Sequence, residues 1–301
     1  MGFRQIPSHN IDKSKWDDCI RSHANGLIYS TTAYLDAMAE NWTGIVFGDY
    51  EAVMPIAWKK KYGIKYCYSI PFIQQLGLAG RDELADHADI KEIIQSFIKY
   101  GDYSFNFQNN SIIRNDEISL RNNYILPLDD YNTVAGNYSS DLLSNLKKAA
   151  AKDFIYTDGD IETALNIYYS LYHSRTPHVS KNDYENFRRL SKSLQSAGHA
   201  FVKQVTGANN ETLAIAVFLN DGKRIYNMAS STADAGRKTG ANHLLFDNII
   251  REYSGKNLIL DFEGSDIGGI KSFYKKFGAV NQPYFTWHFN KLPWPLRLFK
   301  Q

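Results

Sequence analysis

The sequence predicts an α/β protein of two similar units in tandem, each with a mixed sheet flanked by helices. One observation behind this fold class is a pair of apolar, β-prone runs at residues 214–219 and 224–229, joined through Asp221-Gly222, a strong hairpin signal. The other is a second strand pair at residues 51–60 and 64–70, which shares an Ala-Val strand, a basic hairpin and a tyrosine-containing return strand. Two strand pairs that share these sequence features indicate a duplicated unit.

The same elements follow each strand pair along the chain. After a loop, apolar residues at helical spacing predict helices at residues 89–100 and 241–253, and buried-type strands follow at 103–107 and 258–262. Chance similarity of two ordinary hairpins is the alternative interpretation. The repeated order of strand pair, helix and strand favours duplication.

The remaining elements complete the two units. The first helix, at residues 14–24, takes Ser14 as its N-cap. A polar, turn-rich stretch at residues 129–137 is interpreted as the link, which predicts domains at 1–136 and 137–301. The other predicted elements are helices at 31–40, 139–151, 161–173 and 182–197, strands at 43–47, 121–128 and 283–289, and a helix containing Ile270, Phe273 and Phe277 that ends at Gly278.

Composition argues against several classes of function. The 301 residues carry a net charge of +2, which gives no global argument for binding DNA or an anionic membrane and no basic stripe for tRNA. No apolar run is long enough to cross a bilayer and the polar N-terminal segment lacks a signal-peptide core, so a cytoplasmic location is expected. Cys19 and Cys67 are interpreted as buried thiols, and no metal site is predicted.

Residues 237–242, with the sequence Arg-Lys-Thr-Gly-Ala-Asn, form a candidate anion site at the start of a predicted helix. Free backbone N–H groups at a helix start, a flexible glycine and two cations suit a phosphate group. The alternative is a tight turn with two solvated charges. The candidate donor-binding residues are Arg237, Lys238, Gly240, Ala241 and Asn242.

Two carboxylates follow the predicted strand at residues 258–262. Glu263 and Asp266 lie just past its carboxyl end, where open α/β sheets place ligands, so either could accept a proton from an amine. Capping of the next helix is the alternative for one of them, and Glu263 is the first choice as the base. Tyr226 and Tyr274 are candidate proton donors, with burial in the core as the alternative.

These two stretches resemble the Gcn5-related N-acetyltransferase (GNAT) superfamily and, within it, the FemABX-like peptidoglycan aminoacyltransferases. Residues 237–242 are similar to the R/Q-x-x-G-x-G/A loop that holds the pyrophosphate of acyl-coenzyme A, with Asn242 in place of the usual glycine or alanine. Residues 261–264 and 268–278 are similar to the D-F-x-G and G-I-x-x-F-K-x-x-F-G ending of Fem-like proteins. Tyr274 replaces the lysine of the F-K pair, directly before two lysines.

The resemblance implies two tandem acetyltransferase-like lobes, of which the second carries the acyl-donor site. It implies an acyltransferase that moves an acyl or aminoacyl group from acyl-CoA or aminoacyl-tRNA to an amine acceptor such as a cell-wall precursor. If the lysine of the F-K pair assists transfer in relatives, Tyr274 or the neighbouring Lys275 takes that role here. The alternatives are an acyl-CoA N-acetyltransferase acting on a small amine or amino sugar, and a non-catalytic binding protein. The sequence has no nucleophile motif, which fits direct transfer.

The first lobe offers candidate acceptor contacts. Lys60, in the basic hairpin, could meet a phosphorylated acceptor, with an exposed hairpin as the alternative. Gln74 and Gln75 lie in an apolar loop between a proline and a glycine, as residues that line a cleft often do. The tail at residues 291–300 mixes aromatic and cationic residues, as interfacial membrane segments do, but its two prolines favour packing on its own lobe.

Overall fold

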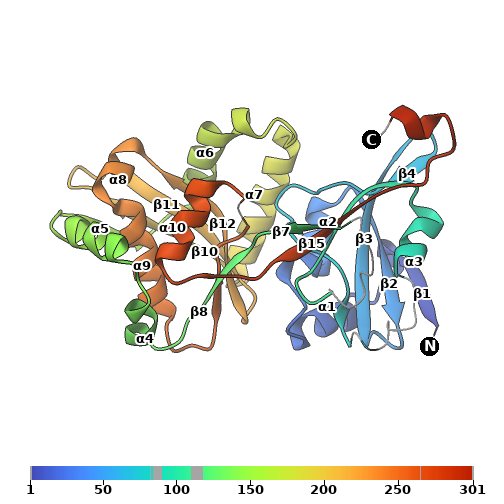
Figure 1. Ribbon diagram of the computed structural model, residues 1–301, viewed down its shortest axis with the longest axis horizontal. Helices are drawn as coiled ribbons and strands as arrows, with labels where there is room; N and C mark the ends of the chain where they lie inside the picture. The colour runs from blue at the N-terminus through green and yellow to red at the C-terminus, as the bar shows by residue number, and fades with distance from the viewer. Residues whose placement is uncertain (1, 82, 84–89, 110–117, 265, 300–301) are drawn as a thin grey trace. The chain divides into compact units, whose positions relative to one another are not determined.

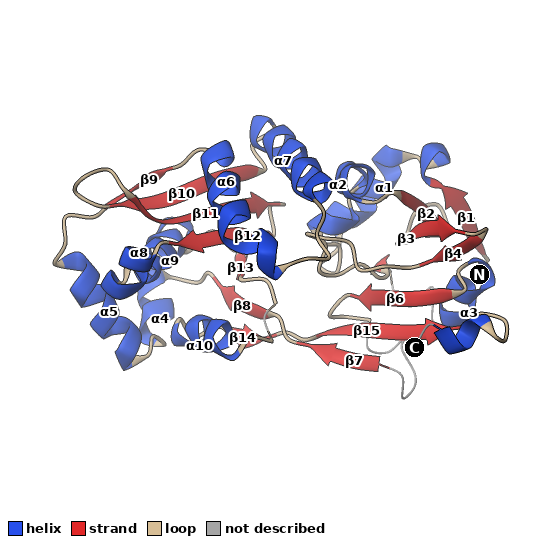
Figure 2. Ribbon diagram, turned by 90° about the horizontal axis from the view of Figure 1, so that it is seen from above, coloured by secondary structure: helices blue, strands red, loops and turns tan. Residues whose placement is uncertain are grey.

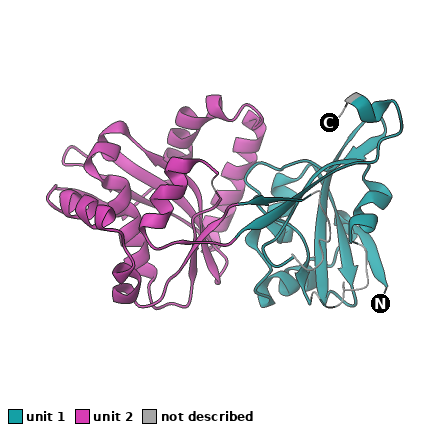
Figure 3. Ribbon diagram, in the orientation of Figure 1, with its two compact units in different colours: residues 1–121, 283–301 teal, residues 122–282 magenta. Residues whose placement is uncertain are grey.

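The computed structural model describes residues 2–81, 83, 90–109, 118–264 and 266–299 of the chain (Figure 1). It divides into two compact units, which Figure 3 colours separately. Unit 1 consists of residues 1–121 and 283–301, and unit 2 consists of residues 122–282. Among the described residues, no helix combines the length and the apolarity needed to cross a bilayer.

Unit 1 contains an eight-stranded mixed sheet in the order β1-β2-β3-β4-β6-β15-β7, with β5 paired to β3. Its strands are β1 Phe3–Pro7, β2 Asn41–Phe47, β3 Ala52–Lys61, β4 Ile64–Tyr66, β5 Ala79–Gly80, β6 Tyr100–Phe105, β7 Ile118–Arg121 and β15 Tyr284–Asn290, and its helices are α1 Lys13–Ser22, α2 Thr32–Met38 and α3 Ile90–Phe97. The start of the predicted helix at residue 89 lies outside the described residues.

Unit 2 contains a seven-stranded mixed sheet in the order β14-β8-β13-β12-β11-β10-β9. Helices α6 and α7 lie on one side of this sheet, and α9 lies on the other (Figure 2). Its strands are β8 Tyr124–Pro127, β9 Ile155–Asp158, β10 Ala200–Thr206, β11 Thr212–Asn220, β12 Arg224–Thr232, β13 Ile259–Asp261 and β14 Val280–Asn281, and its helices are α4 Tyr131–Gly136, α5 Ser140–Ala150, α6 Ile161–Tyr172, α7 Lys181–Ser196, α8 Asp234–Thr239, α9 Ala241–Tyr253 and α10 Gly268–Lys276.

The duplication predicted from the sequence is present in the topology. In unit 1, β3 and β4 form an antiparallel pair, α3 follows, and β6 pairs in parallel with β4. In unit 2, β11 and β12 form an antiparallel pair, α9 follows, and β13 pairs in parallel with β12. The predicted α/β fold with two mixed sheets is therefore confirmed.

Each unit inserts one strand from a distant part of the chain. In unit 1, β15 lies between β6 and β7 and is antiparallel to both. In unit 2, β8 lies between β13 and β14, again antiparallel to both. The predicted closing strand at residues 283–289 is therefore correct in position, but it completes unit 1. Residues 283–301, which include the tail, belong to unit 1 and not to the second predicted domain at 137–301.

Three local predictions differ from the structure. The predicted strand at residues 121–128 is two strands, β7 and β8, and the unit boundary falls between them. The predicted link at residues 129–137 contains α4, whose Val134 is buried in the core of unit 2, so residue 136 lies within that unit. Helix α1 is capped by Asp12, which accepts a hydrogen bond from the Lys15 backbone N–H, and not by Ser14.

Aromatic side chains join α9 and α10 to the sheet in the core of unit 2. The Phe246 ring on α9 lies 5.4 Å from the Phe262 ring and 6.1 Å from the Phe218 ring on β11. Phe277, at the end of α10, packs 6.0 Å from Phe262. These side chains are buried and close-packed, so they hold the carboxyl end of β13, from which the following loop begins, in one position.

A buried ion pair connects β12 with β13. The Arg224 Nη1 atom lies 3.0 Å from Asp261 Oδ2, and the two residues are 3% and 1% exposed. The Asn123 side-chain amide also donates to Asp261, at 3.2 Å. Removing one partner of such a pair leaves a buried charge without compensation, which costs several kcal/mol.

We expect Arg224→Met to lower the free energy of unfolding by about 3–5 kcal/mol, because Asp261 stays buried without its cation. Arg237→Met is the matched control, since Arg237 forms an exposed pair with Asp234 at 3.4 Å, and its loss should cost less than about 1 kcal/mol. Chemical denaturation of both variants measures the difference. Equal losses in the two variants would contradict the special role of the buried pair.

Candidate functional site

The parallel strands β12 and β13 separate at the carboxyl end of the unit 2 sheet. They pair at three positions only, the last being Tyr226 with Asp261. Strand β12 then continues to Thr232, and Met228 is an extra residue in its pairing with β11. Such a bulge redirects neighbouring side chains, and the carboxyl ends of parallel strands are common places for ligands.

Glu263 follows β13 at this opening. Its backbone has a left-handed conformation with φ of 63°, which is unusual for a residue with a side chain. The backbone N–H of Glu263 donates to Asp261 Oδ1 at 3.0 Å, so the carboxylate of the buried ion pair also holds this turn. The Glu263 residue is partly buried, and desolvation raises the pKa of its carboxyl group to about 8.

Tyr274 of α10 lies close enough to Glu263 for the charge of that carboxyl group to act on the Tyr274 hydroxyl. Its ring stacks on Phe262 at 4.6 Å, and the residue is buried. Burial raises the pKa of the Tyr274 hydroxyl far above neutrality, and the negative charge of Glu263 raises it further. The phenol is therefore protonated at neutral pH and can donate a hydrogen bond or a proton.

Asn227 of β12 completes the group. Its side chain hydrogen-bonds with the Tyr274 hydroxyl, while its Oδ1 atom has no hydrogen-bond partner in the described part of the chain. The residue is 5% exposed, so this oxygen is withdrawn from water at a cost. Tyr168 of α6 is close enough to influence the Tyr274 hydroxyl, and desolvation raises the pKa of Tyr168 to about 12. We call Asn227, Tyr168, Glu263 and Tyr274 the Glu263 cluster.

The predicted donor loop is mostly helical. Arg237 and Lys238 are exposed on α8, and Gly240 joins α8 to α9 in a left-handed conformation with φ of 79°. A Cβ atom on Gly240 would lie 3.0 Å from the backbone oxygen of Asn145 on α5. The packing of α5 and the reversal of the chain therefore explain this glycine without a phosphate.

The first two residues of α9 have different environments. Ala241 is fully buried in the core. Asn242 is partly buried, and its Oδ1 atom lacks a hydrogen-bond partner among the described residues. The donor-binding role of both residues stays a prediction.

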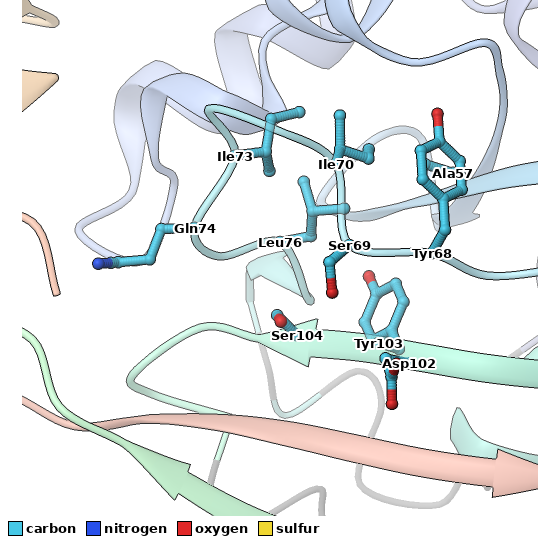
Figure 4. A pocket seen from close by; sticks show the side chains of 10 residues that line it. All are labelled: Ala57, Tyr68, Ser69, Ile70, Ile73, Gln74, Leu76, Asp102, Tyr103 and Ser104. Atoms are coloured by element: carbon cyan, nitrogen blue, oxygen red, sulfur yellow. The ribbon is translucent and has the colours of Figure 1, made fainter. Parts of the chain in front are cut away.

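Unit 1 has a pocket beyond the point where β4 and β6 separate, since these strands pair only at Tyr66 and Tyr100. Figure 4 shows the hydroxyl groups of Ser69 and Tyr103 pointing toward each other in this pocket, while the Gln74 amide points away. The lining residues are Ala57, Tyr68, Ser69, Ile70, Ile73, Gln74, Leu76, Asp102, Tyr103 and Ser104.

No protein-family model matches the sequence, and a sequence search of curated proteins found no match. Solved structures match closely in shape. FemX aligns with a TM-score of 0.70 and 15% identity over 100% of both chains. A tandem GNAT protein from the clavulanic acid biosynthesis pathway aligns with a TM-score of 0.53 and 10% identity over 97% of this chain and 99% of its own. The chain has a FemX-like fold of tandem GNAT units.

A third similar structure is the C-terminal domain of a putative lysylphosphatidylglycerol synthetase from Agrobacterium fabrum. It aligns with a TM-score of 0.59 and 11% identity over 96% of this chain and 94% of its own. The FemX-like fold therefore extends over the whole chain, and the likeness predicted from the motifs is confirmed at the level of fold.

Within the FemX-like fold, the predicted catalytic residues occupy different places. Glu263 and Tyr274 lie together, whereas the buried Tyr226 donates its hydroxyl hydrogen to Asp221 in the hairpin at 2.6 Å. Asp266 is exposed and accepts from the Asn122 amide at 2.7 Å, so it does not cap α10, and Ser265 lies outside the described residues. Lys275 is exposed, with its Nζ atom 6.0 Å from the centre of the Tyr124 ring.

The predicted acceptor residues also separate. Gln74 lines the unit 1 pocket, but Gln75 is buried, where its carbonyl accepts from the Phe107 N–H at 3.1 Å and its amide donates to Gln74 at 2.6 Å. Lys60 is exposed near the end of β3 and does not line the pocket. In the described part of the chain, no cluster of three or more histidine, cysteine or acidic side chains could hold a metal ion.

Sequence reasoning missed two members of the Glu263 cluster. Asn227 interrupts the apolar run of β12, which is a detectable signal, since a polar residue in a buried strand needs a partner. Tyr168 gives no such signal, because it is one of several tyrosines on α6. Only the packing of α6 brings it to the cluster.

The raised pKa of Glu263 predicts a pH-dependent stability. The folded protein holds a proton on Glu263 up to about pH 8, whereas the unfolded chain releases it near 4.5. The contribution of Glu263 to stability is therefore complete below pH 4.5 and is lost as the pH rises to 8. We expect the free energy of unfolding of the native protein to fall relative to that of Glu263→Gln over this range.

Chemical denaturation of both proteins across this pH range measures the effect. Asp153→Asn, at an exposed carboxylate of unit 2, controls for the loss of a carboxylate. A stability difference between the native protein and Glu263→Gln that does not change with pH would refute the raised pKa.

Proposed function

We propose that this protein is an acyltransferase that moves an acyl or aminoacyl group to an amine acceptor at the Glu263 cluster. The observation that carries the proposal is the pairing of a partly buried carboxyl group, with a pKa of about 8, and a buried phenol at the opening between β12 and β13. The FemX-like fold, which is shared with a tandem GNAT protein and with a domain of a putative lysylphosphatidylglycerol synthetase, supports the same class of reaction.

The cluster contains the groups that direct transfer requires. The Glu263 carboxylate takes a proton from the acceptor amine as its nitrogen forms a bond to the carbonyl carbon of the donor. The carbon–oxygen bond of an aminoacyl ester, or the carbon–sulfur bond of a thioester, then breaks. The leaving atom takes a proton from the Tyr274 hydroxyl, and the proton held on Glu263 restores the phenol.

The pKa of Glu263 suits this role. A general base works best when its pKa lies near the operating pH, because it must be ionised often enough and still hold the proton it receives. Burial provides this value at Glu263, while the hydrogen bond from its backbone to Asp261 fixes the position of the carboxylate. Asn227 orients the Tyr274 hydroxyl in the same way.

For the acceptor, we propose the pocket of unit 1. Its Ser69 hydroxyl can form hydrogen bonds with a polar, uncharged group such as a sugar or a peptide, whereas the Tyr103 hydroxyl is already bonded to the Pro55 oxygen and the Gly77 N–H. A cell-wall precursor contains both kinds of group together with a free amine. A small amine or amino sugar is the second candidate for the same pocket.

The donor is acyl-CoA or aminoacyl-tRNA. The exposed cations Arg237 and Lys238 support a phosphate contact near the start of α9. The side chain of Asn242 is larger than the glycine or alanine usual at this position, so it hinders close contact between a pyrophosphate and the start of α9. This favours aminoacyl-tRNA over acyl-CoA as the donor. A binding protein without activity would need neither the raised pKa of Glu263 nor the buried phenol beside it.

We expect Glu263→Gln to lower the rate of transfer by about 10²- to 10⁴-fold, since a general base is lost while the side chain keeps its shape. Single-turnover transfer to a nucleotide-linked cell-wall precursor, from charged tRNA or acetyl-CoA, measures this rate. Tyr274→Phe should also slow the reaction, and Asp153→Asn should not. Transfer at the native rate by Glu263→Gln would refute the role of the cluster.

Calorimetric titration with acetyl-CoA distinguishes the two donors. If acyl-CoA is the donor, a concentration one hundredfold above its dissociation constant should stabilise the protein by about 2.7 kcal/mol. The double variant Arg237→Gln/Lys238→Gln should then weaken binding. A Gly240 variant would be ambiguous, because its side chain would meet α5. The absence of binding would favour an aminoacyl donor or a site without catalysis, and transfer from charged tRNA would then distinguish these two.

A further inference from the structure

Four lysines from neighbouring strands meet at one end of the unit 1 sheet. Lys60 of β3 pairs directly with Lys65 of β4. The Lys99 N–H, just before β6, donates to the Lys65 backbone oxygen at 3.0 Å, and the Lys291 N–H, just after β15, donates to the Lys99 oxygen at 2.7 Å. We call these four residues the lysine row.

Among the described residues, no carboxylate neutralises the lysine row. Lys59, next to it, pairs with Glu40 at 3.7 Å, whereas none of the four lysines pairs with a carboxylate of the described residues. Lys65 instead lies over the Trp58 ring at 4.4 Å. Because Lys60, Lys99 and Lys291 are exposed, their charges face solvent.

Exposed apolar side chains flank the lysine row. Trp294, Leu298 and Leu296, in the tail that follows Lys291, are 80%, 60% and 45% exposed. The Arg297 backbone oxygen accepts a hydrogen bond from the Asn290 amide at 3.3 Å, so the tail folds back toward the end of β15. In Figure 1 the tail and the turn between β3 and β4 lie at the same end of unit 1.

The turn between β3 and β4 adds to this surface. Tyr62, in that turn, is 92% exposed, so packing against the protein does not explain its aromatic ring. Single exposed apolar residues are ordinary. An indole, a phenol and two leucines beside lysines that have no carboxylate partner in the described part of the chain form a combination that marks an interaction surface.

We propose that this end of unit 1 binds the surface of an anionic lipid bilayer. Lysines close to such a surface are attracted by its negative potential, and tryptophan and tyrosine prefer the interface between lipid and water. The exposed leucines favour a membrane over RNA as the partner. Leucine side chains can be buried among lipid chains, whereas the phosphate backbone of RNA offers them no apolar contact. The cations and the apolar side chains thus supply the two signals that stable peripheral binding needs.

The inference does not depend on the proposed reaction, since it rests on unit 1 alone. The net charge of +2 gives no global argument for an anionic membrane, because it is an average over the whole chain, whereas the lysine row gathers cations at one end of unit 1. Membrane binding would also explain the exposure of the tail. Leu292 is buried, but the apolar residues that follow it, Trp294, Leu296 and Leu298, are exposed to solvent.

The test is co-sedimentation of the full chain with vesicles of phosphatidylcholine, alone or mixed equally with phosphatidylglycerol. We expect binding to the mixed vesicles and a blue shift of the Trp294 emission. The double variant Lys99→Gln/Lys291→Gln should weaken partitioning about 30-fold, since each lysine contributes about fivefold. The matched control Lys147→Gln/Lys148→Gln, at two exposed lysines of α5, should partition as the native protein does.

A second pair of changes tests the apolar part. Trp294→Ala/Leu298→Ala should weaken partitioning by about tenfold or more, because the variant transfers less apolar surface from water into the bilayer. Circular dichroism shows whether each variant is folded. Equal partitioning of the two lysine variants, or no partitioning of the native protein into the mixed vesicles, overturns the proposal. Binding of tRNA through Lys99 and Lys291 without any binding to vesicles also overturns it.

Discussion

The organisation of unit 2 depends on the ion pair between Arg224 and Asp261. One Asp261 oxygen meets the guanidinium of Arg224 on β12 and the amide of Asn123, at the entry of the chain into this unit, while the other accepts the N–H of Glu263. A single carboxylate therefore connects two strands, the unit boundary and the turn that holds the proposed base. Both charges are buried, so this arrangement is stable only while all its partners are present.

Two carboxylates of one short segment have different surroundings. Burial raises the pKa of both Asp261 and Glu263, and at Asp261 the Arg224 guanidinium, 3.0 Å away, partly opposes this shift. Chemistry that moves a proton needs such a difference between neighbouring groups. The backbone of Glu263 has a left-handed conformation, with φ of 63°. The cost of that conformation, of about 1 kcal/mol or more, is offset by the hydrogen bond to Asp261.

Local patterns in the sequence were sufficient for most of the fold. The Asp221-Gly222 turn and the apolar spacing of α9 identified β11, β12 and α9 closely, because these elements are determined by neighbours in the chain. The places of β8 and β15 in the middle of their sheets are not predicted, since the alternation of apolar residues in a strand does not say which strands it pairs with. Glu263 and Tyr274 were found from their motif, but Asn227 and Tyr168 reach them only through tertiary packing.

The position of β15 at the end of the chain has a consequence for synthesis of the protein. Unit 2 is one continuous segment, and all its strands have left the ribosome before β15 emerges. Unit 1 starts first but can close its sheet only last, because β6 and β7 must wait for a strand that is translated after the whole of unit 2. A nascent chain of this protein therefore carries an open sheet edge through most of its translation, which is a natural point of contact for a chaperone.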